Sequence, residues 1–227
     1  MPSLLLKCAV LVACLGSVVG CKLQVDIPEP SPITYQLTAA ELAWQGYANG
    51  QELRFGRAGS GRVRTFKVLV KQDVLATQWR PGGWLPLPTA ERIYQHIEVT
   101  GQRTDSIIYR KSISSADSAM VTDVWLDLYK YENRGGTLET RATIGWSYWF
   151  SSALPIDSLA INRFTSSNGI ELLPAITLGP ATYEQVVKIT RQVSAPTPHI
   201  ITQVYYAKGL GVVAYEEAGT GLWYRLP

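Results

Sequence analysis

Apolar and polar residues alternate in short stretches along most of this 227-residue chain, and no other feature limits the fold as strongly. Successive side chains of a strand point to opposite faces, so alternation predicts half-buried β-strands. From Arg62 to Lys71, for example, Phe66, Val68 and Val70 share one face. The other predicted strands are Leu53–Phe55, Glu91–Thr100, Ser106–Ile113, Val121–Tyr131, Thr137–Phe150, Ala175–Leu178, Thr182–Gln192, Ile200–Ala207, Leu210–Glu217 and Leu222–Leu226.

These stretches are separated by Gly, Asn-Gly and Pro signals, and Arg134-Gly135-Gly136 predicts a tight hairpin between two of them. Twelve Tyr and seven Trp residues also favour strands over helices. The pattern predicts an all-β fold, either an antiparallel sandwich or a partly open barrel. A strand–helix–strand rhythm is missing from the sequence, so we do not expect a parallel sheet.

One short helix is expected near the start of this domain, within Thr38 to Tyr47. Thr38 and Glu41 have the spacing of a capping box, in which each side chain bonds the backbone N–H of the other residue. A segment of this length is not stable alone, so the helix must pack against the sheet.

The first residues have the pattern of an export signal. Lys7 supplies a positive charge, and the uncharged run from Cys8 to Val19 is shorter than the about 20 apolar residues of a membrane span. Its length fits the apolar region of a secretory signal peptide, about 7–15 residues. The alternatives are an ordinary signal peptide with incidental cysteines, or a short buried helix.

The end of this run, Val18-Val19-Gly20-Cys21, resembles the lipobox of bacterial lipoproteins. The resemblance implies cleavage between Gly20 and Cys21 and lipidation of Cys21, whose acyl chains anchor the protein to a membrane. The stretch from Leu11 to Cys14 has the same pattern, but cleavage there would leave too short an apolar core. We therefore predict a signal peptide (1–20), a lipidated Cys21 with a Pro-rich tether (21–32) and one β domain (33–227).

Composition narrows the function of that domain. No cysteine follows Cys21, which leaves no disulfide, thiolate nucleophile or sulfur metal site. The formal net charge of +3 gives no reason to expect nucleic acid as a partner. His96 and His199 are isolated, and we interpret both as solvated surface residues and not as metal ligands. We expect no metal and no cofactor.

Both ends of the domain resemble a known group of proteins. The opening Leu37–Trp44 with Gly50–Phe55, and the closing Val204–Tyr215 with Leu222-Trp223, are similar to uncharacterised lipoproteins common in the Bacteroidota. The resemblance implies the outer membrane. In that group, surface export often uses Lys followed closely by acidic residues. Here Leu23, Gln24 and Val25 separate Lys22 from Asp26, which favours the periplasmic side.

Carboxylates suggest one enzymatic alternative. Asp123 and Asp127 are predicted on one strand face, with Glu139 on the neighbouring strand. Glycosidases use two carboxylates about 5–10 Å apart, whereas residues four apart in a strand are separated by about 13 Å. A cross-strand partner would be needed, so a solvated face is the better interpretation. No nucleophile elbow, Walker motif or dinucleotide fingerprint occurs in the sequence.

Aromatic residues are the other candidates for a site. Trp79 and Trp84 lie in a Pro/Gly-rich stretch, and Trp146 and Trp149 lie near a predicted strand end. Such rings stack on sugars or apolar ligands, but they also fill β cores. The sequence therefore predicts a non-enzymatic envelope lipoprotein, held to the membrane through Cys21, that binds an envelope protein or a glycan. The alternative is an envelope or polysaccharide hydrolase with Asp or Glu in a cleft.

Overall fold

The computed structural model describes residues 31–78, 90–105, 122–133, 136–146, 150–191 and 200–227. Its elements are β1 (Ile33–Tyr35), α2 (Ala39–Leu42), β2 (Glu52–Arg57), β3 (Val63–Gln78), β4 (Glu91–Arg103), β5 (Thr122–Glu132), β6 (Leu138–Trp146), β7 (Phe150–Leu154), α3 (Ile156–Ala160), β8 (Ser166–Ser167), β9 (Ile170–Leu178), β10 (Ala181–Thr190), β11 (Ile201–Ala207), β12 (Gly211–Glu217) and β13 (Gly221–Arg225).

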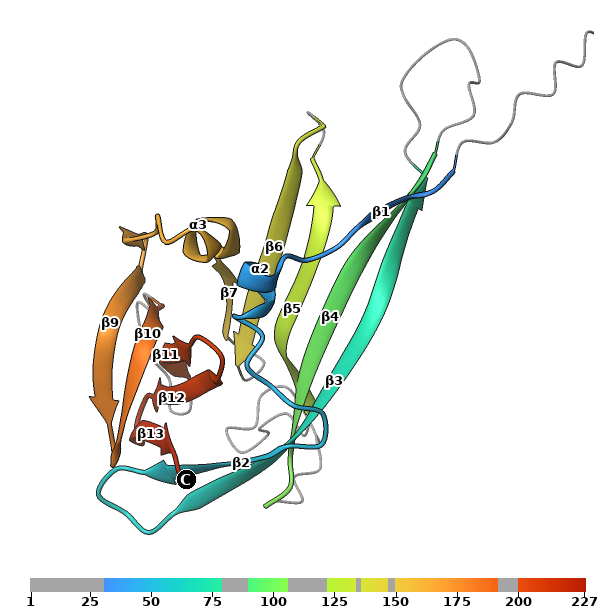
Figure 1. Cartoon of the computed structure of the whole chain (residues 1–227). Helices are drawn as coiled ribbons and strands as arrows, with labels where there is room; N and C mark the ends of the chain where they lie inside the picture. Colours follow the sequence, from blue (N-terminus) through green and yellow to red (C-terminus); the bar gives the residue numbers. More distant parts are fainter. Residues whose placement is uncertain (1–30, 79–89, 106–121, 134–135, 147–149, 192–199) are drawn as a thin grey trace, which may run out of the picture.

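In the described part of the chain, thirteen strands form one sheet whose main path runs β7-β6-β5-β4-β3-β2-β13-β12-β11-β10-β9-β8. The chain therefore builds two antiparallel meanders, and the last strand, β13, pairs with β2 in the middle of the sheet. The path ends at β7 and β8 and does not close into a barrel. This confirms the predicted all-β, antiparallel class, and the structure shows the sheet to be open (Figure 1).

The two meanders share one apolar core. Val68 and Val99 from the first meander belong to the same buried cluster as Val187 and Val204 from the second. Trp146 of β6 connects them, since its ring centroid lies 4.5 Å from Trp125, 5.3 Å from Phe55 and 5.0 Å from Tyr215. The sheet curls because its apolar face can leave water only by packing against itself.

Two short helices lie near the ends of the open sheet. In α2 both bonds of the predicted capping box are present between Thr38 and Glu41, but the helix is a single turn and ends before Tyr47. The sequence analysis missed α3, which contacts α2 and β6. It follows Pro155, which ends strand β7 and suits the start of a helix. Among the described residues, no helix is long and apolar enough to cross a membrane.

A β-bulge in β5 corrects the predicted alternation. The register of β5 against β4 shifts between Val99 and Thr100, which pair with Leu126 and Val124. Trp125 is the extra residue of this bulge and is buried, whereas Val124 is exposed. Its indole ring covers Gly101 of β4, where a side chain would have no room.

One further prediction about strands was wrong in detail. The stretch predicted as one strand from Thr137 to Phe150 is two paired strands, β6 and β7. The sheet is antiparallel as predicted, except that the short β1 pairs in parallel with β4. β5 pairs with β4 only from His96 onwards, so the first residues of β4 can accept β1. The predicted strand Ser106–Ile113 lies outside the described residues.

The close packing of Trp125 on Gly101 predicts that adding one methyl group at Gly101 lowers the stability of the fold. A Cβ at Gly101 would lie 1.9 Å from Trp125 Cε2, so Gly101→Ala must displace a fully buried ring. We expect the free energy of unfolding to fall by about 1–3 kcal/mol, as in other overpacked cores. Urea unfolding followed by Trp fluorescence measures it.

Gly61→Ala is the matched control. A Cβ at Gly61 meets no atom within 4 Å, and the change should leave stability nearly unaltered. Equal stability of the two variants would contradict the packing derived for Trp125.

Candidate functional site

A buried network of charges joins α2 to the sheet. The Glu41 carboxylate accepts hydrogen bonds from Lys130 Nζ of β5 at 2.6 Å and from Thr140 Oγ1 of β6 at 2.5 Å. Burial would raise the pKa of Glu41, but the bonds from Lys130 and Thr140 outweigh it and lower the pKa below its ordinary value. Asp157 of α3 accepts from the Thr140 backbone N–H, so both helices are attached at this point. The groups of this network are hydrogen-bonded to one another, which suits a structural role.

This network predicts how stability changes with pH. A carboxyl group whose pKa is lower in the folded state stabilises the fold above its unfolded pKa, and this contribution is lost as the pH falls through the folded pKa. Glu41→Gln should therefore lower the free energy of unfolding by about 1–3 kcal/mol near neutral pH. The deficit should shrink as the pH falls below about 4.

Denaturant unfolding at a series of pH values tests this expectation, with Glu184→Gln as the control at an exposed carboxylate. A Glu41→Gln deficit that stays constant down to low pH would contradict the assigned role of the Glu41 charge.

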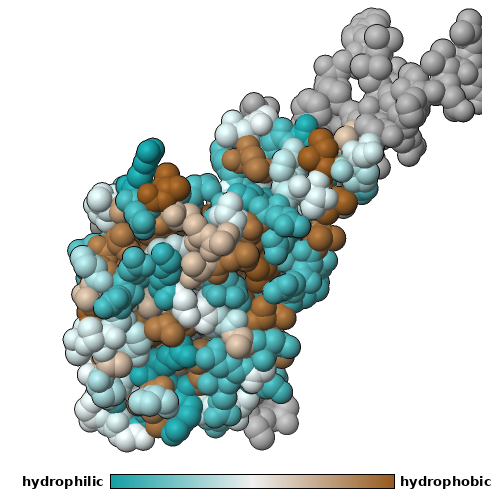
Figure 2. All heavy atoms as spheres, in the orientation of Figure 1, coloured by the Kyte–Doolittle hydropathy of each residue, from teal (hydrophilic) through white to brown (hydrophobic). Residues whose placement is uncertain are grey.

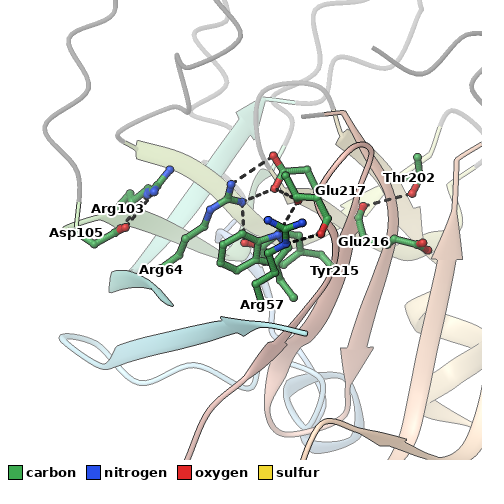
Figure 3. Close-up of polar contacts among 10 residues, drawn as sticks. Arg57, Arg64, Arg103, Asp105, Thr202, Tyr215, Glu216 and Glu217 are labelled. Atoms are coloured by element: carbon green, nitrogen blue, oxygen red, sulfur yellow. Dashed lines mark hydrogen bonds and ion pairs between the residues drawn. The ribbon is translucent and has the colours of Figure 1, made fainter. Parts of the chain in front are cut away.

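A second polar cluster lies between β3 and β12 (Figure 3). The guanidinium of Arg64 bonds both carboxylate oxygens of Glu217, at 2.6 and 3.3 Å, and the hydroxyl of Tyr215 at 3.0 Å. Its carbon Cζ also lies 4.0 Å from the ring centroid of Trp223. Glu217 is further bonded by Thr220. These contacts join the two meanders next to the β2–β13 pairing.

Electrostatics in this cluster favour a permanent ion pair. Burial would lower the pKa of Arg64, but Tyr215 and Glu217 raise it overall. Burial also raises the pKa of Tyr215, so its hydroxyl stays protonated at neutral pH. Each charged group of the cluster already has partners within it. The cluster is therefore a structural ion pair and not a reactive acid or base.

Removing Arg64 should therefore be costly. Arg64→Ala removes both guanidinium bonds to the Glu217 carboxylate, which is only 3% exposed, and we expect a loss of about 3–5 kcal/mol of unfolding free energy. Arg141→Ala, at an exposed arginine of β6, should leave stability nearly unaltered. Thermal and urea unfolding of both variants measure the difference, and a small effect of Arg64→Ala would show that the pair contributes little.

The predicted carboxylate set is not brought together. The bulge at Trp125 turns Asp123 and Asp127 to opposite faces of the sheet, so they do not share one as predicted. Asp127 Oδ1 lies 2.7 Å from His96 Nε2, and Glu139 accepts bonds from Tyr131 and Asn133 on the β5–β6 hairpin. His96 is mostly covered, which corrects its interpretation as a solvated residue.

The tryptophans predicted as ligand contacts divide into two groups. Trp146 is 3% exposed and belongs to the core, which was one of its two predicted roles. Trp79, Trp84 and Trp149 lie outside the described residues, as do Gly20, Cys21 and His199. Among the described residues, no three His, Cys, Asp or Glu side chains are grouped so that they could hold a metal ion.

An exposed arm is the remaining candidate for function. We define the arm as Lys71–Gln78 of β3, Glu91–Glu98 of β4 and β1; it extends beyond the rest of the sheet in Figure 1. Val74 is 58% exposed, and Leu75 and Ile33 are exposed as well. Apolar atoms lie among hydrophilic ones along this part of the surface in Figure 2.

Stacking and pairing within the arm make it an ordered element. Tyr35 of β1 and Tyr94 of β4 stack with ring centroids 5.3 Å apart, and β3 pairs with β4 without a register shift from Phe66 to Gln78. The strand predicted from Arg62 to Lys71 is therefore longer than expected and continues to Gln78. The apolar run from Val74 to Ala76, which fits a strand, could have indicated this extension.

Comparison with known proteins adds no further constraint. No protein-family model, no curated protein and no solved structure matches this chain.

Proposed function

We propose that this protein is a lipoprotein of the outer membrane, anchored through Cys21 and facing the periplasm, whose β domain binds another envelope protein through its arm. The arm carries this proposal, because it exposes apolar side chains on an ordered element. Val74 and Leu75 are neighbours in β3 and point to opposite faces of the arm. An uncovered strand of this kind is a common site for a partner protein. The buried charges elsewhere in the described part of the chain have partners within the fold.

The position of the anchor supports the same conclusion. β1 follows the tether directly, and its first residue, Ile33, pairs with Arg92 near the outer end of the arm. Pro32, the last residue of the Pro-rich stretch, therefore lies next to the outer end of the arm. A tether of this kind extends about 3.1 Å per residue, so Cys21 would hold the arm within about 30 Å of the lipid surface. Partners in or at the same membrane come within its reach.

Fractionation tests the anchor. Cys21→Ser should remove the lipid and move the protein out of the membrane fraction, because one sulfur atom holds all the acyl chains. Cys14→Ser is the matched control and should leave the protein membrane-bound and labelled by a radioactive fatty acid. Lipid retained by Cys21→Ser, or lost in Cys14→Ser, would contradict the assignment of Cys21.

Site-specific photocrosslinking tests the arm. A photoreactive amino acid at Val74 should give protein adducts in intact cells. The same probe at Ile161, which is equally exposed at 59% but lies just after α3, should not. Adducts at both positions or at neither would contradict an interaction role for the arm.

A further inference from the structure

The arm has an open backbone edge on the side of β3 that faces away from β4. β2 pairs with β3 only as far as Lys67, and the backbone of Val68 then bonds to Gly50 and Gln51. The side chain of Asn49 accepts from the Val70 N–H. Among the residues that the structure describes, no strand pairs with this edge between Gln72 and Gln78.

The direction of the backbone groups follows from this pairing. In a strand, the N–H and C=O of one residue point to the same side, and those of the next residue point to the other side. The backbone groups of Val68 and Val70 point to the side of β3 away from β4. The N–H and C=O groups of positions 72, 74 and 76 therefore point to that side as well. The Val74 N–H bonds to the carboxylate of its neighbour Asp73 at 2.7 Å, a contact that another strand can replace.

This edge lacks the features that usually prevent strand pairing. Natural edges are protected by proline, by bulges or by inward-pointing charges. Charged side chains protect an edge too, and Lys71 and Asp73 form an ion pair at the inner end of this segment. From Val74 to Gln78, however, β3 has no charge and no proline, its pairing with β4 shows no bulge, and it exposes Val74 and Leu75. An edge of this kind can add a strand from a partner.

We propose that the partner is a second copy of this chain, and that two β3 strands pair antiparallel about a twofold axis at Leu75. This register sets Leu75 opposite its own copy and Val74 opposite Ala76, so that apolar positions meet apolar positions on both faces. It forms about four backbone hydrogen bonds between Val74 and Ala76 of the two copies. The pairing specifies the partner for the proposed interaction role, but it does not depend on the anchor.

Neighbouring registers are less favourable. An axis at Val74 would set Leu75 opposite Asp73, and an axis at Asp73 would bring two like charges together. An axis at Gln72 would place Ala76 of the partner opposite Val68, where Gly50 and Gln51 already occupy the edge. Of these four registers, the one centred on Leu75 combines an open backbone with matched side-chain positions.

The size of the interface explains where the pairing would occur. One strand pair buries little area compared with the about 1,200–2,000 Å² of stable complexes. Attachment to one membrane confines the copies and raises their effective concentration, which strengthens a weak contact without new interactions. We therefore expect pairing to be strong in the membrane and weak in dilute detergent.

Disulfide crosslinking in membranes tests the register. No cysteine follows Cys21, so an introduced cysteine is unambiguous. Opposite residues that are not hydrogen-bonded lie with Cα atoms about 4.5 Å apart, within the range of a disulfide. Leu75→Cys in the full-length chain should form a covalent dimer under mild oxidation. Leu69→Cys, at an exposed leucine of the same strand outside the pairing, should not.

Two substitutions test the pairing without a new bond. Val74→Pro removes an N–H that points to the open edge and leaves the ladder with β4 intact, and Leu75→Lys places two like charges at the axis. Both should abolish the noncovalent dimer seen by chemical crosslinking in membranes, whereas Leu69→Lys should not. Thermal unfolding of each variant shows whether it is folded, and Leu75→Lys remains informative if Val74→Pro does not fold.

The outcomes separate this inference from the proposed function. A Leu75→Cys dimer that also forms in Cys21→Ser protein at high concentration supports self-pairing, whatever the anchor does. Stronger dimer formation by Val74→Cys than by Leu75→Cys would overturn the register. A monomer in every variant, with Val74 photoadducts to a different protein, would overturn self-pairing and leave the interaction role standing.

Discussion

The pairing of β13 with β2 is the contact on which the architecture depends. It joins the end of the chain to its first long strand and so makes one sheet of two meanders. Without it, each meander would expose one side of the shared core, because Trp146 packs against residues of both. The pairing has a high sequence separation, so its loop-closure entropy must be offset by this large common core.

Two buried ion pairs connect elements that are distant in the sequence. Arg64 and Glu217 connect β3 with β12 across the β2–β13 contact, and Glu41 with Lys130 holds α2 on the inner face. Buried ion pairs contribute little net stability compared with apolar residues, but breaking one is costly. Our hypothesis is that these ion pairs mainly favour one arrangement of the strands over others. The Arg64 and Glu41 variants test it.

The arm differs from the rest of the domain because the β3 residues 71–76 are paired with β4 but remain exposed. Its exposed strand edge is an aggregation risk for a soluble protein, and a defined partner removes that risk. The apolar pair Val74 and Leu75 could be read from the sequence, but not its location at an open edge. That location depends on where β2 stops pairing with β3, which is set by the turn at Asn49 and Gly50.

By itself, the sequence determined the all-β class, most strand positions and the capping box of α2, because alternation and capping are local patterns with direct structural consequences. Tertiary structure alone decided the β2–β13 junction, the parallel β1, the bulge at Trp125 and the start of α3. These features arise from contacts between distant segments. Such contacts override the local alternation of the sequence wherever they bury additional apolar surface. Trp125 is the clearest case, since its large ring is buried only by breaking the alternation that predicted the strand.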